Sequence, residues 1–448
     1  MSQSDRPTLL KTLGVFDGIT MLVGITIGAG IFSAPQRIAA YFDSFTPILM
    51  LWILAGFFIF LGGLIYAELG ARLPNTGGEY VYITRCFGPF SGFMFGWAQL
   101  FIIRTSPVAG LSIVTVDYLG HFVELTNWAR TAAALGFVAV LGAINYIGIH
   151  RAGFYQKLST VVKVTGLLVL VVVGLILVQD RGSMLGVAAP DSGDLDPVGS
   201  TIAAMMLIVF SYMGFERLGY SAEEMKDPKR TIPVSMFVGI SVIIVIYIST
   251  NILYYQVFGV AEIREHTRVA ADVATELLGP AGAAFIAIIV MVSATGSING
   301  TMMTAPRVYY AMAHDGIFFR WFDHVHPIYR TPSHAIVAHC VWGAVILIVR
   351  GSFETIMAGM VFAVLIFFAL NTLALFKLRR EGVGGDNVYQ LPLFPWLPGV
   401  YLFGILSLLI MRFIYEWQNS LTDLLFVASG LPFYLIWRRQ TVAPEQRK

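Results

Sequence analysis

Charged residues are scarce in this sequence. Aspartate, glutamate, lysine and arginine make up 12% of the 448 residues, whereas hydrophobic residues make up 57%. A soluble domain carries about 25% charged residues, so this composition excludes a soluble protein and predicts an integral membrane protein. The net charge is only +2, which provides no basic field for a nucleic-acid partner.

Cysteine is almost absent. Cys86 and Cys340 are the only two in the chain, and both lie in or near apolar runs. They form neither a disulfide framework nor the spacing of a thiolate metal site. The two histidines of residues 323–327 lie in a loop without a cluster of cysteines and carboxylates, so they do not indicate a metal site. No catalytic dyad stands out, so the sequence predicts neither an enzyme nor a bound metal or cofactor.

Apolar runs of about 20 residues, long enough to cross a bilayer as helices, occur throughout the chain. Twelve runs begin near residues 13, 46, 87, 128, 154, 199, 232, 280, 333, 352, 393 and 419. If both termini are cytoplasmic, the termini and cytoplasmic loops hold 19 of the 29 lysines and arginines and the opposite loops hold six. This bias follows the positive-inside rule. We therefore predict an all-α, multi-pass protein of a cell membrane, with twelve transmembrane helices in a single domain over residues 1–448.

The first apolar run is interrupted by three closely spaced glycines, Gly24, Gly28 and Gly30. Each glycine weakens a helix by about 1 kcal/mol relative to alanine. Within a membrane, non-helical backbone persists only where it is buried in protein or lines a wet cavity. The sixth run contains a second interruption, at 210–216. Paired interruptions of this kind bind carboxylates, amines or cations near the midplane, and we expect such a site here.

The two interruptions lie five runs apart, and an odd separation means that the second copy enters the membrane from the opposite side. Runs one to five cover residues 11–178 and runs six to ten cover residues 199–377, so the two halves have similar lengths. We therefore expect an inverted repeat, with the two extra helices over 393–438 outside it. Such repeats permit alternating access by rocking.

At the first interruption, the N–H groups of Ala29, Gly30 and Ile31 would open the following half-helix and form an anion site. Carbonyl groups near Ile25 and Thr26 would face an ammonium, so one interruption can hold both ends of a zwitterion. The alternative is that these glycines only allow close helix packing. The presence of a second interruption favours the binding site.

At the second interruption, Phe210 and Tyr212 can form aromatic walls and Gly214 permits the bend. Glu216 and Arg217 follow directly. An ionisable residue inside a membrane is a functional candidate, and Glu216 is a candidate for proton or amine sensing. An adjacent pair of opposite charges can also simply neutralise itself.

Two further cations are expected near the midplane. Lys163 lies nine residues into the fifth run, a depth from which it must pair, contact carbonyl groups or lose its proton. It can serve as a fixed substitute for a bound cation beside the first interruption. Arg104, in the third run, can meet a substrate side chain or Glu216, or form a structural ion pair.

Several motifs resemble the amino acid–polyamine–organocation superfamily of transporters, and the resemblance spans nearly all of the first ten runs. Within that superfamily, the sequences around Arg104 and Lys163 are similar to the L-type amino acid transporters and their bacterial relatives. The motifs are Gly28–Phe32, Tyr66–Leu69, Gly77–Tyr80, Gly214–Glu216, Glu223–Pro233, Gly296–Gly300 and Pro306–Gly316.

The resemblance implies a LeuT-like fold of five-plus-five inverted repeats and sodium-independent movement of amino acids. It also implies that Lys163 takes the place of a sodium ion and that Phe210 gates the substrate. Glu216 corresponds to a functionally important glutamate of arginine/agmatine and putrescine antiporters. The alternatives are therefore a cationic amino acid or polyamine antiporter and a proton-coupled symporter.

Two departures refine this expectation. Several relatives have glycine where Met213 stands, and a methionine pointing inward would restrict the pocket to small neutral amino acids. The loop 120–127 lacks the cysteine that links L-type members to a glycoprotein, so we expect no disulfide-linked heavy subunit and a monomer or homodimer.

A channel would require a continuous polar pore, which the sequence does not provide. The predicted substrate-binding residues are Ile25, Thr26, Gly28, Ala29, Gly30, Ile31, Arg104, Phe210, Ser211, Tyr212, Met213, Gly214 and Phe215, with Lys163 and Glu216 as coupling residues.

Overall fold

The computed structural model describes residues 11–28, 30–178, 197–266, 268–350 and 360–435. These residues form a helical bundle with ten apolar helical segments long enough to cross a membrane, some of which combine consecutive helices. The helices of the first half are α1 (Val15–Thr26), α2 (Gly30–Ser33), α3 (Pro35–Ala39), α4 (Phe45–Arg72), α5 (Glu79–Phe87), α6 (Pro89–Ala98), the π turn η2 (Gln99–Ile103), α7 (Thr105–Leu119), α8 (Asn127–Ile147) and α9 (Ile149–Leu177).

The rest of the chain is also helical in its described residues. Its helices are α10 (Pro197–Tyr212), the 3₁₀ helix η3 (Phe215–Glu224), α11 (Pro228–Ile263), α12 (Val269–Leu278), α13 (Pro280–His314), the 3₁₀ turn η4 (Arg320–Phe322), α14 (Ser333–Arg350), α16 (Met360–Arg380), α17 (Trp396–Tyr415) and α18 (Trp417–Ala428). The runs predicted near residues 333 and 419 form shorter apolar helices than the other ten. The predicted linker 179–196 and the start of the run near 352 lie outside the described residues.

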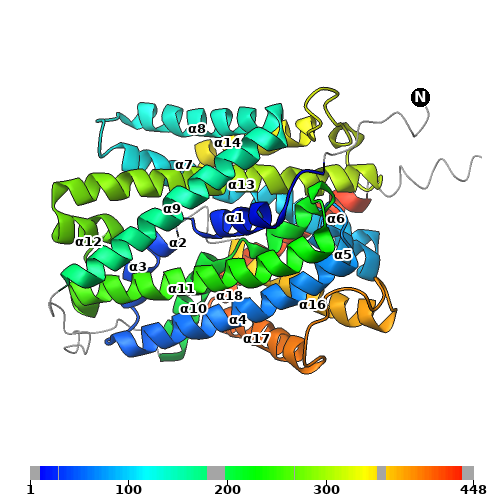
Figure 1. Ribbon diagram of the computed structural model, residues 1–448. Helices are drawn as coiled ribbons and strands as arrows, with labels where there is room; N and C mark the ends of the chain where they lie inside the picture. Colours follow the sequence, from blue (N-terminus) through cyan, green and yellow to red (C-terminus); the bar gives the residue numbers. More distant parts are fainter. Residues whose placement is uncertain (1–10, 29, 179–196, 267, 351–359, 436–448) are drawn as a thin grey trace, which may run out of the picture.

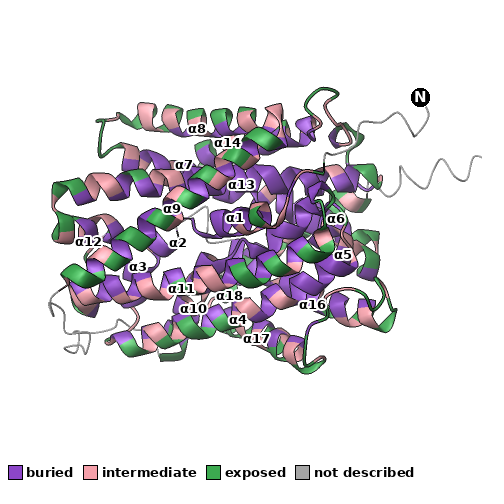
Figure 2. Cartoon of the chain, in the orientation of Figure 1, coloured by how far each residue is buried: buried purple, intermediate pink, exposed green. Residues whose placement is uncertain are grey.

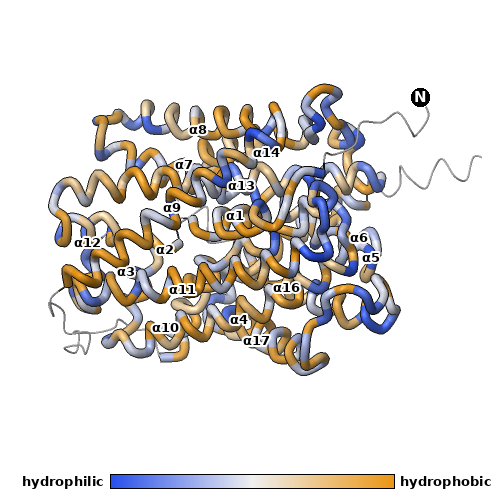
Figure 3. Tube along the Cα trace, in the orientation of Figure 1, coloured by the Kyte–Doolittle hydropathy of each residue, from blue (hydrophilic) through white to orange (hydrophobic). Residues whose placement is uncertain are grey.

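The broken first segment lies in the centre of the bundle. Helix α1 packs against α9, α11 and α13, which surround it in Figure 1. Figure 2 shows buried residues concentrated around α1, with exposed residues along α8, α9 and α17. The outer helices nevertheless remain apolar along most of their length (Figure 3). A helix that is hydrophobic on its outer face suits a lipid environment rather than water.

Hydrophilic residues gather at the ends of the bundle, most densely around α5 and α6 (Figure 3). At this same end, the start of the described chain pairs with the segment that follows η3. Leu13 forms an isolated parallel bridge with Met225. The backbone N–H groups of Thr12 and Leu13 donate to the Glu224 carbonyl, and the N–H of Lys226 donates to the Leu13 carbonyl. The first and sixth segments are therefore joined at this end as well as in the middle.

Candidate functional site

The first segment is broken where its glycines predicted a break. Helix α1 ends at Thr26, and α2 begins at Gly30. The next residue, Ile27, caps the helix with φ −74° and ψ 85°, which lie outside the helical region. Ala29, one of the predicted binding residues, lies outside the described residues. The break leaves main-chain carbonyl groups near the end of α1 without helical partners.

The sixth segment is broken at Gly214. Helix α10 ends at Tyr212, and η3 begins at Phe215. Gly214 has φ 132°, a conformation that side-chain-bearing residues rarely adopt. The Gly214 N–H, freed from the helix, donates to Glu216 Oε2 at 2.8 Å. A glycine is therefore required for the turn, and the Glu216 carboxylate accepts the hydrogen bond of the backbone N–H that the turn leaves without a helical partner.

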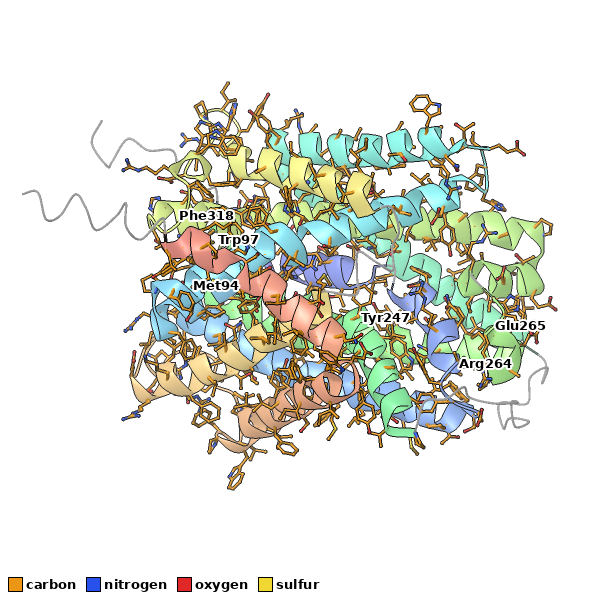
Figure 4. All side chains as sticks on the ribbon, turned by 180° about the vertical axis from the view of Figure 1, so that it is seen from behind. Met94, Trp97, Tyr247, Arg264, Glu265 and Phe318 are labelled. Atoms are coloured by element: carbon orange, nitrogen blue, oxygen red, sulfur yellow. The ribbon has the colours of Figure 1, made fainter. Side chains whose placement is uncertain are left out.

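The two breaks pack directly against each other. A Cβ atom at Gly30 would lie 2.7 Å from Ser211 Cα, and one at Gly214 would lie 3.1 Å from Thr26 Cα. The Tyr247 hydroxyl of α11 lies 3.1 Å from the Thr26 carbonyl oxygen and 3.0 Å from that of Ser211. Figure 4 shows Tyr247 near the middle of the bundle, well away from Arg264 and Glu265 at one end. Both breaks therefore meet at the centre of the protein.

Substituting Gly30 with alanine should destabilise the protein. The added methyl group would press on the Ser211 backbone, which cannot move aside as a flexible side chain would. Overpacking of this kind costs roughly 1–3 kcal/mol. Thermal unfolding of the purified protein measures the effect. Gly153→Ala, in α9 with no atom within 4 Å of the added Cβ, is the control and should be neutral or stabilising. A Gly30→Ala protein as stable as the wild type would contradict this close contact.

Lys163 of α9 satisfies the carbonyl groups freed by the first break. Its Nζ donates to the carbonyl oxygens of Gly24, Ile27 and Ser293 at 2.9, 2.8 and 2.8 Å. Three acceptors match the three protons of an ammonium group. Ser297 Oγ of α13 also donates to the Gly24 carbonyl, at 3.0 Å. The predicted position of Lys163 beside the first break is therefore found in the structure.

A buried charged network lies beside the second break. Arg104 Nη1 donates to Glu216 Oε1 at 2.8 Å, and its Nη2 donates to the Tyr220 hydroxyl at 2.9 Å. Tyr220 in turn donates to Glu79 Oε2. Glu79 Oε1 accepts from the Tyr66 hydroxyl at 2.6 Å and from Asn371 Nδ2 at 2.8 Å. Of the expected partners of Arg104, Glu216 is therefore the one it contacts.

A pocket opens between the two breaks and encloses about 430 Å³, including its mouth. Several of the predicted binding residues line it. These are Ile25, Thr26, Gly28, Gly30, Phe210, Ser211 and Met213. The lining also contains Pro107 and Leu111 of α7, Ser297 and Thr301 of α13, Met360 of α16, and Arg217. The pocket is therefore walled by both breaks and by three further helices.

The other predicted binding residues lie around the pocket rather than in its lining. Ile31 is fully buried. The Tyr212 ring packs against Trp52 and Tyr247. Phe215 packs against Tyr66 and Phe368, and Arg104 belongs to the charged network. Gly214 provides the turn beside them. These residues position the breaks instead of facing the cavity.

The sequence analysis missed Ser297 and Thr301. They lie four residues apart in α13, so they share one face of that helix. Small hydroxyl residues at this spacing in an apolar run were the available signal, within and just beyond the motif Gly296–Gly300. Arg217 was noted as ionisable but was not expected in the pocket, because its neighbour Glu216 was the obvious partner.

Comparisons with known proteins extend over the whole chain. A family model described as amino acid permease matches residues 13–435. The serine/threonine exchanger SteT of Bacillus subtilis (strain 168) is 30% identical over 433 residues, covering 95% of this chain and 96% of SteT.

Two animal transporters are similar over a comparable length. The b(0,+)-type amino acid transporter 1 of Mus musculus is 28% identical over 436 residues, which cover 96% of this chain and 88% of the transporter. The cystine/glutamate transporter of Homo sapiens is 25% identical over 445 residues, with 97% and 87% covered. The similarity therefore includes every element that builds the pocket.

Proposed function

Because the chain belongs to the amino acid permease family, within the amino acid–polyamine–organocation superfamily, we propose that it exchanges small neutral L-amino acids by alternating access and without sodium. The observation that carries the proposal is the pocket between two broken membrane segments. Two polar side-chain atoms of its lining, Thr26 Oγ1 and Arg217 Nε, are buried without a hydrogen-bond partner. Buried polar groups are normally satisfied, so these atoms favour a polar ligand.

The main chain at the breaks can hold the two charged groups common to all α-amino acids. The N–H groups of Gly30 and Ile31, with that of Ala29 in the predicted site, face a carboxylate in this proposal. The Tyr247 hydroxyl has one proton but lies within hydrogen-bond distance of the carbonyl oxygens of both Thr26 and Ser211. One of these two oxygens is therefore always free of that proton and can accept from the substrate ammonium.

We also propose that the chain has twelve transmembrane helices in a five-plus-five inverted repeat, over residues 11–178 and 199–377, with two extra helices over 393–438. The interruptions in the first and sixth segments support this arrangement, as do the two shorter apolar helices. The lysine and arginine distribution supports cytoplasmic termini in a plasma or inner membrane.

Counterflow tests the exchange proposal. Proteoliposomes that contain the purified protein are loaded with a mixture of unlabelled amino acids, and uptake of labelled alanine and serine is compared with that of empty liposomes. An exchanger should take up label faster into the loaded liposomes, whereas a channel should not respond to loading. Equal uptake rates into loaded and empty liposomes would contradict exchange. Faster uptake in the presence of sodium would contradict the proposal that Lys163 takes the place of a sodium ion.

A proton-coupled symporter or a cationic amino acid or polyamine antiporter is the second candidate. Glu216 favours it, since this buried carboxylate bonds the N–H of Gly214 at the second break. A proton gradient across empty liposomes would then drive accumulation without any internal amino acid. Accumulation of arginine or putrescine in preference to alanine would identify the cationic alternative.

Partners other than the substrate and the bilayer are not expected. Of the two cysteines, Cys86 is buried in α5 and Cys340 lies in α14. Neither is in the 120–127 loop, so we propose a monomer or homodimer without a disulfide-linked heavy subunit.

Met213 should set the upper size of the substrate. It lines the pocket and is only 5% exposed. Met213→Ala therefore empties space in the pocket that a larger substrate side chain can fill. We expect the uptake of tryptophan relative to alanine to rise severalfold, because a longer side chain then fits. Met205→Ala in α10, outside the pocket lining, should not change the ratio. Wild-type uptake that favours tryptophan over alanine would contradict selection for small substrates.

A further inference from the structure

Arg217 is the one charged side chain in the described lining of the pocket. Its Nη1 donates to Thr301 Oγ1 at 2.5 Å. Its Nε is buried and has no hydrogen-bond partner in the described structure. The residue is 5% exposed, so its guanidinium is held nearly dry against the cavity. A buried donor without an acceptor destabilises the protein, and an acceptor entering the pocket would remove that penalty.

The neighbouring carboxylate forms an ion pair with Arg217 but gives its Nε no hydrogen bond. Glu216 Oε1 lies 3.5 Å from Arg217 Nε, and this Nε has no partner with hydrogen-bond geometry among the described residues. Glu216 is instead occupied by Arg104 at Oε1 and by the Gly214 N–H at Oε2, both at 2.8 Å. A role for Arg217 as a purely structural partner of Glu216 therefore leaves its free donor unexplained.

Thr301 fixes the direction of the guanidinium. Its hydroxyl donates to the Ser297 carbonyl of the same helix at 2.9 Å and accepts from Arg217. The pair thus joins α13 to the segment after the second break. A guanidinium fixed in this way presents its remaining donors in a planar fork that matches carboxylate and amide oxygens.

We propose that Arg217, positioned by Thr301, recognises the substrate side chain and selects neutral amino acids whose side chain ends in a carboxamide oxygen, such as asparagine. This inference rests on the proposed function, in which the main chain at the breaks holds the groups that all amino acids share. It narrows that function to side chains that accept hydrogen bonds. It also rejects cationic side chains, which would meet Arg217, the one charged side chain in the described lining of the pocket.

Ligand-induced thermal stabilisation of the purified wild-type protein tests this selection. Asparagine and leucine have side chains of nearly the same shape, so their comparison isolates the polar group. Asparagine should bind about tenfold more tightly than leucine, and lysine should not bind. Leucine binding as tight as that of asparagine would overturn the inference while leaving amino acid binding intact. If no amino acid raised the stability, the proposed function itself would fail.

Variants then assign the selection to these side chains. Arg217→Met should lower the asparagine-to-leucine affinity ratio at least tenfold, because methionine keeps the length but offers no donor. Thr301→Val should lower the ratio about threefold, since the guanidinium loses its anchor. Thr304→Val, one turn along α13, is the matched control because Thr304 Oγ1 bonds only carbonyl groups of its own helix. The proposal would be contradicted if Arg217→Met lost affinity for asparagine and leucine equally, or if Thr301→Val left the asparagine-to-leucine affinity ratio unchanged.

Discussion

Replacing Lys163 with alanine is expected to reduce transport at least tenfold. The substitution removes the ammonium group that donates to three buried carbonyl oxygens, those of Gly24, Ile27 and Ser293. A hydrogen bond from a charged group contributes about 1.5–3 kcal/mol, and each 1.4 kcal/mol corresponds to about tenfold in an equilibrium constant. The shape of the first break depends on these bonds, so substrate binding should weaken together with stability. Counterflow and thermal unfolding measure the two effects.

Lys157→Ala is the matched control for this prediction. Lys157 lies in the same helix, α9, but its side chain is 41% exposed and pairs with Asp17 near the surface. An exposed ion pair contributes about 0–1 kcal/mol, so transport should stay near the wild-type rate. If the Lys163→Ala protein transported as fast as Lys157→Ala, the ammonium would not be needed at the break.

Replacing Arg104 with methionine should cost about 3–5 kcal/mol of stability, the effect of leaving a buried carboxylate without its partner. Arg104 is fully buried and provides the 2.8 Å bond to Glu216. A second substitution, Glu216→Gln, removes one of the two buried carboxylates that pair with Arg104, the other being Glu79 at 3.4 Å, so the double variant should recover part of the loss. Chemical or thermal unfolding of the two single variants and the double variant gives this coupling directly.

Arg130→Met provides the comparison for Arg104→Met. Arg130 also pairs with a carboxylate, Asp117, but the two side chains are 41% and 42% exposed. We expect little loss of stability from this surface pair. If the Arg104→Met/Glu216→Gln protein were less stable than both single variants, the loss of stability in Arg104→Met would not come from an unpaired Glu216 carboxylate.

The sequence predicted the breaks because glycine acts locally. Gly30 and Gly214 alter the backbone where they stand, and the membrane requires any such interruption to be buried or wet. Residues adjacent to a break, such as Phe210 and Met213, were therefore also predictable. Lys163 was placed correctly by depth, since an ammonium far from water needs acceptors.

The opposite wall of the pocket could not be predicted in this way. Ser297 and Thr301 lie in an uninterrupted helix, α13, and only tertiary packing determines which face of that helix turns toward the cavity. The same limit applies to Arg104, which follows the π turn η2 and whose N–H donates to the Gln99 carbonyl. Pro107 has no N–H to give to the preceding turn, but a proline alone does not specify a π turn.

The pairing of Leu13 with Met225 has a mechanical consequence. It ties the beginning of the first segment to the end of η3, while Gly30 and Gly214 interlock the same two segments near the centre. These two contacts, at different levels along the bundle, oppose sliding of the two segments past one another. We therefore expect any tilt that opens the pocket toward that end to move both segments together as one rigid unit against the surrounding helices.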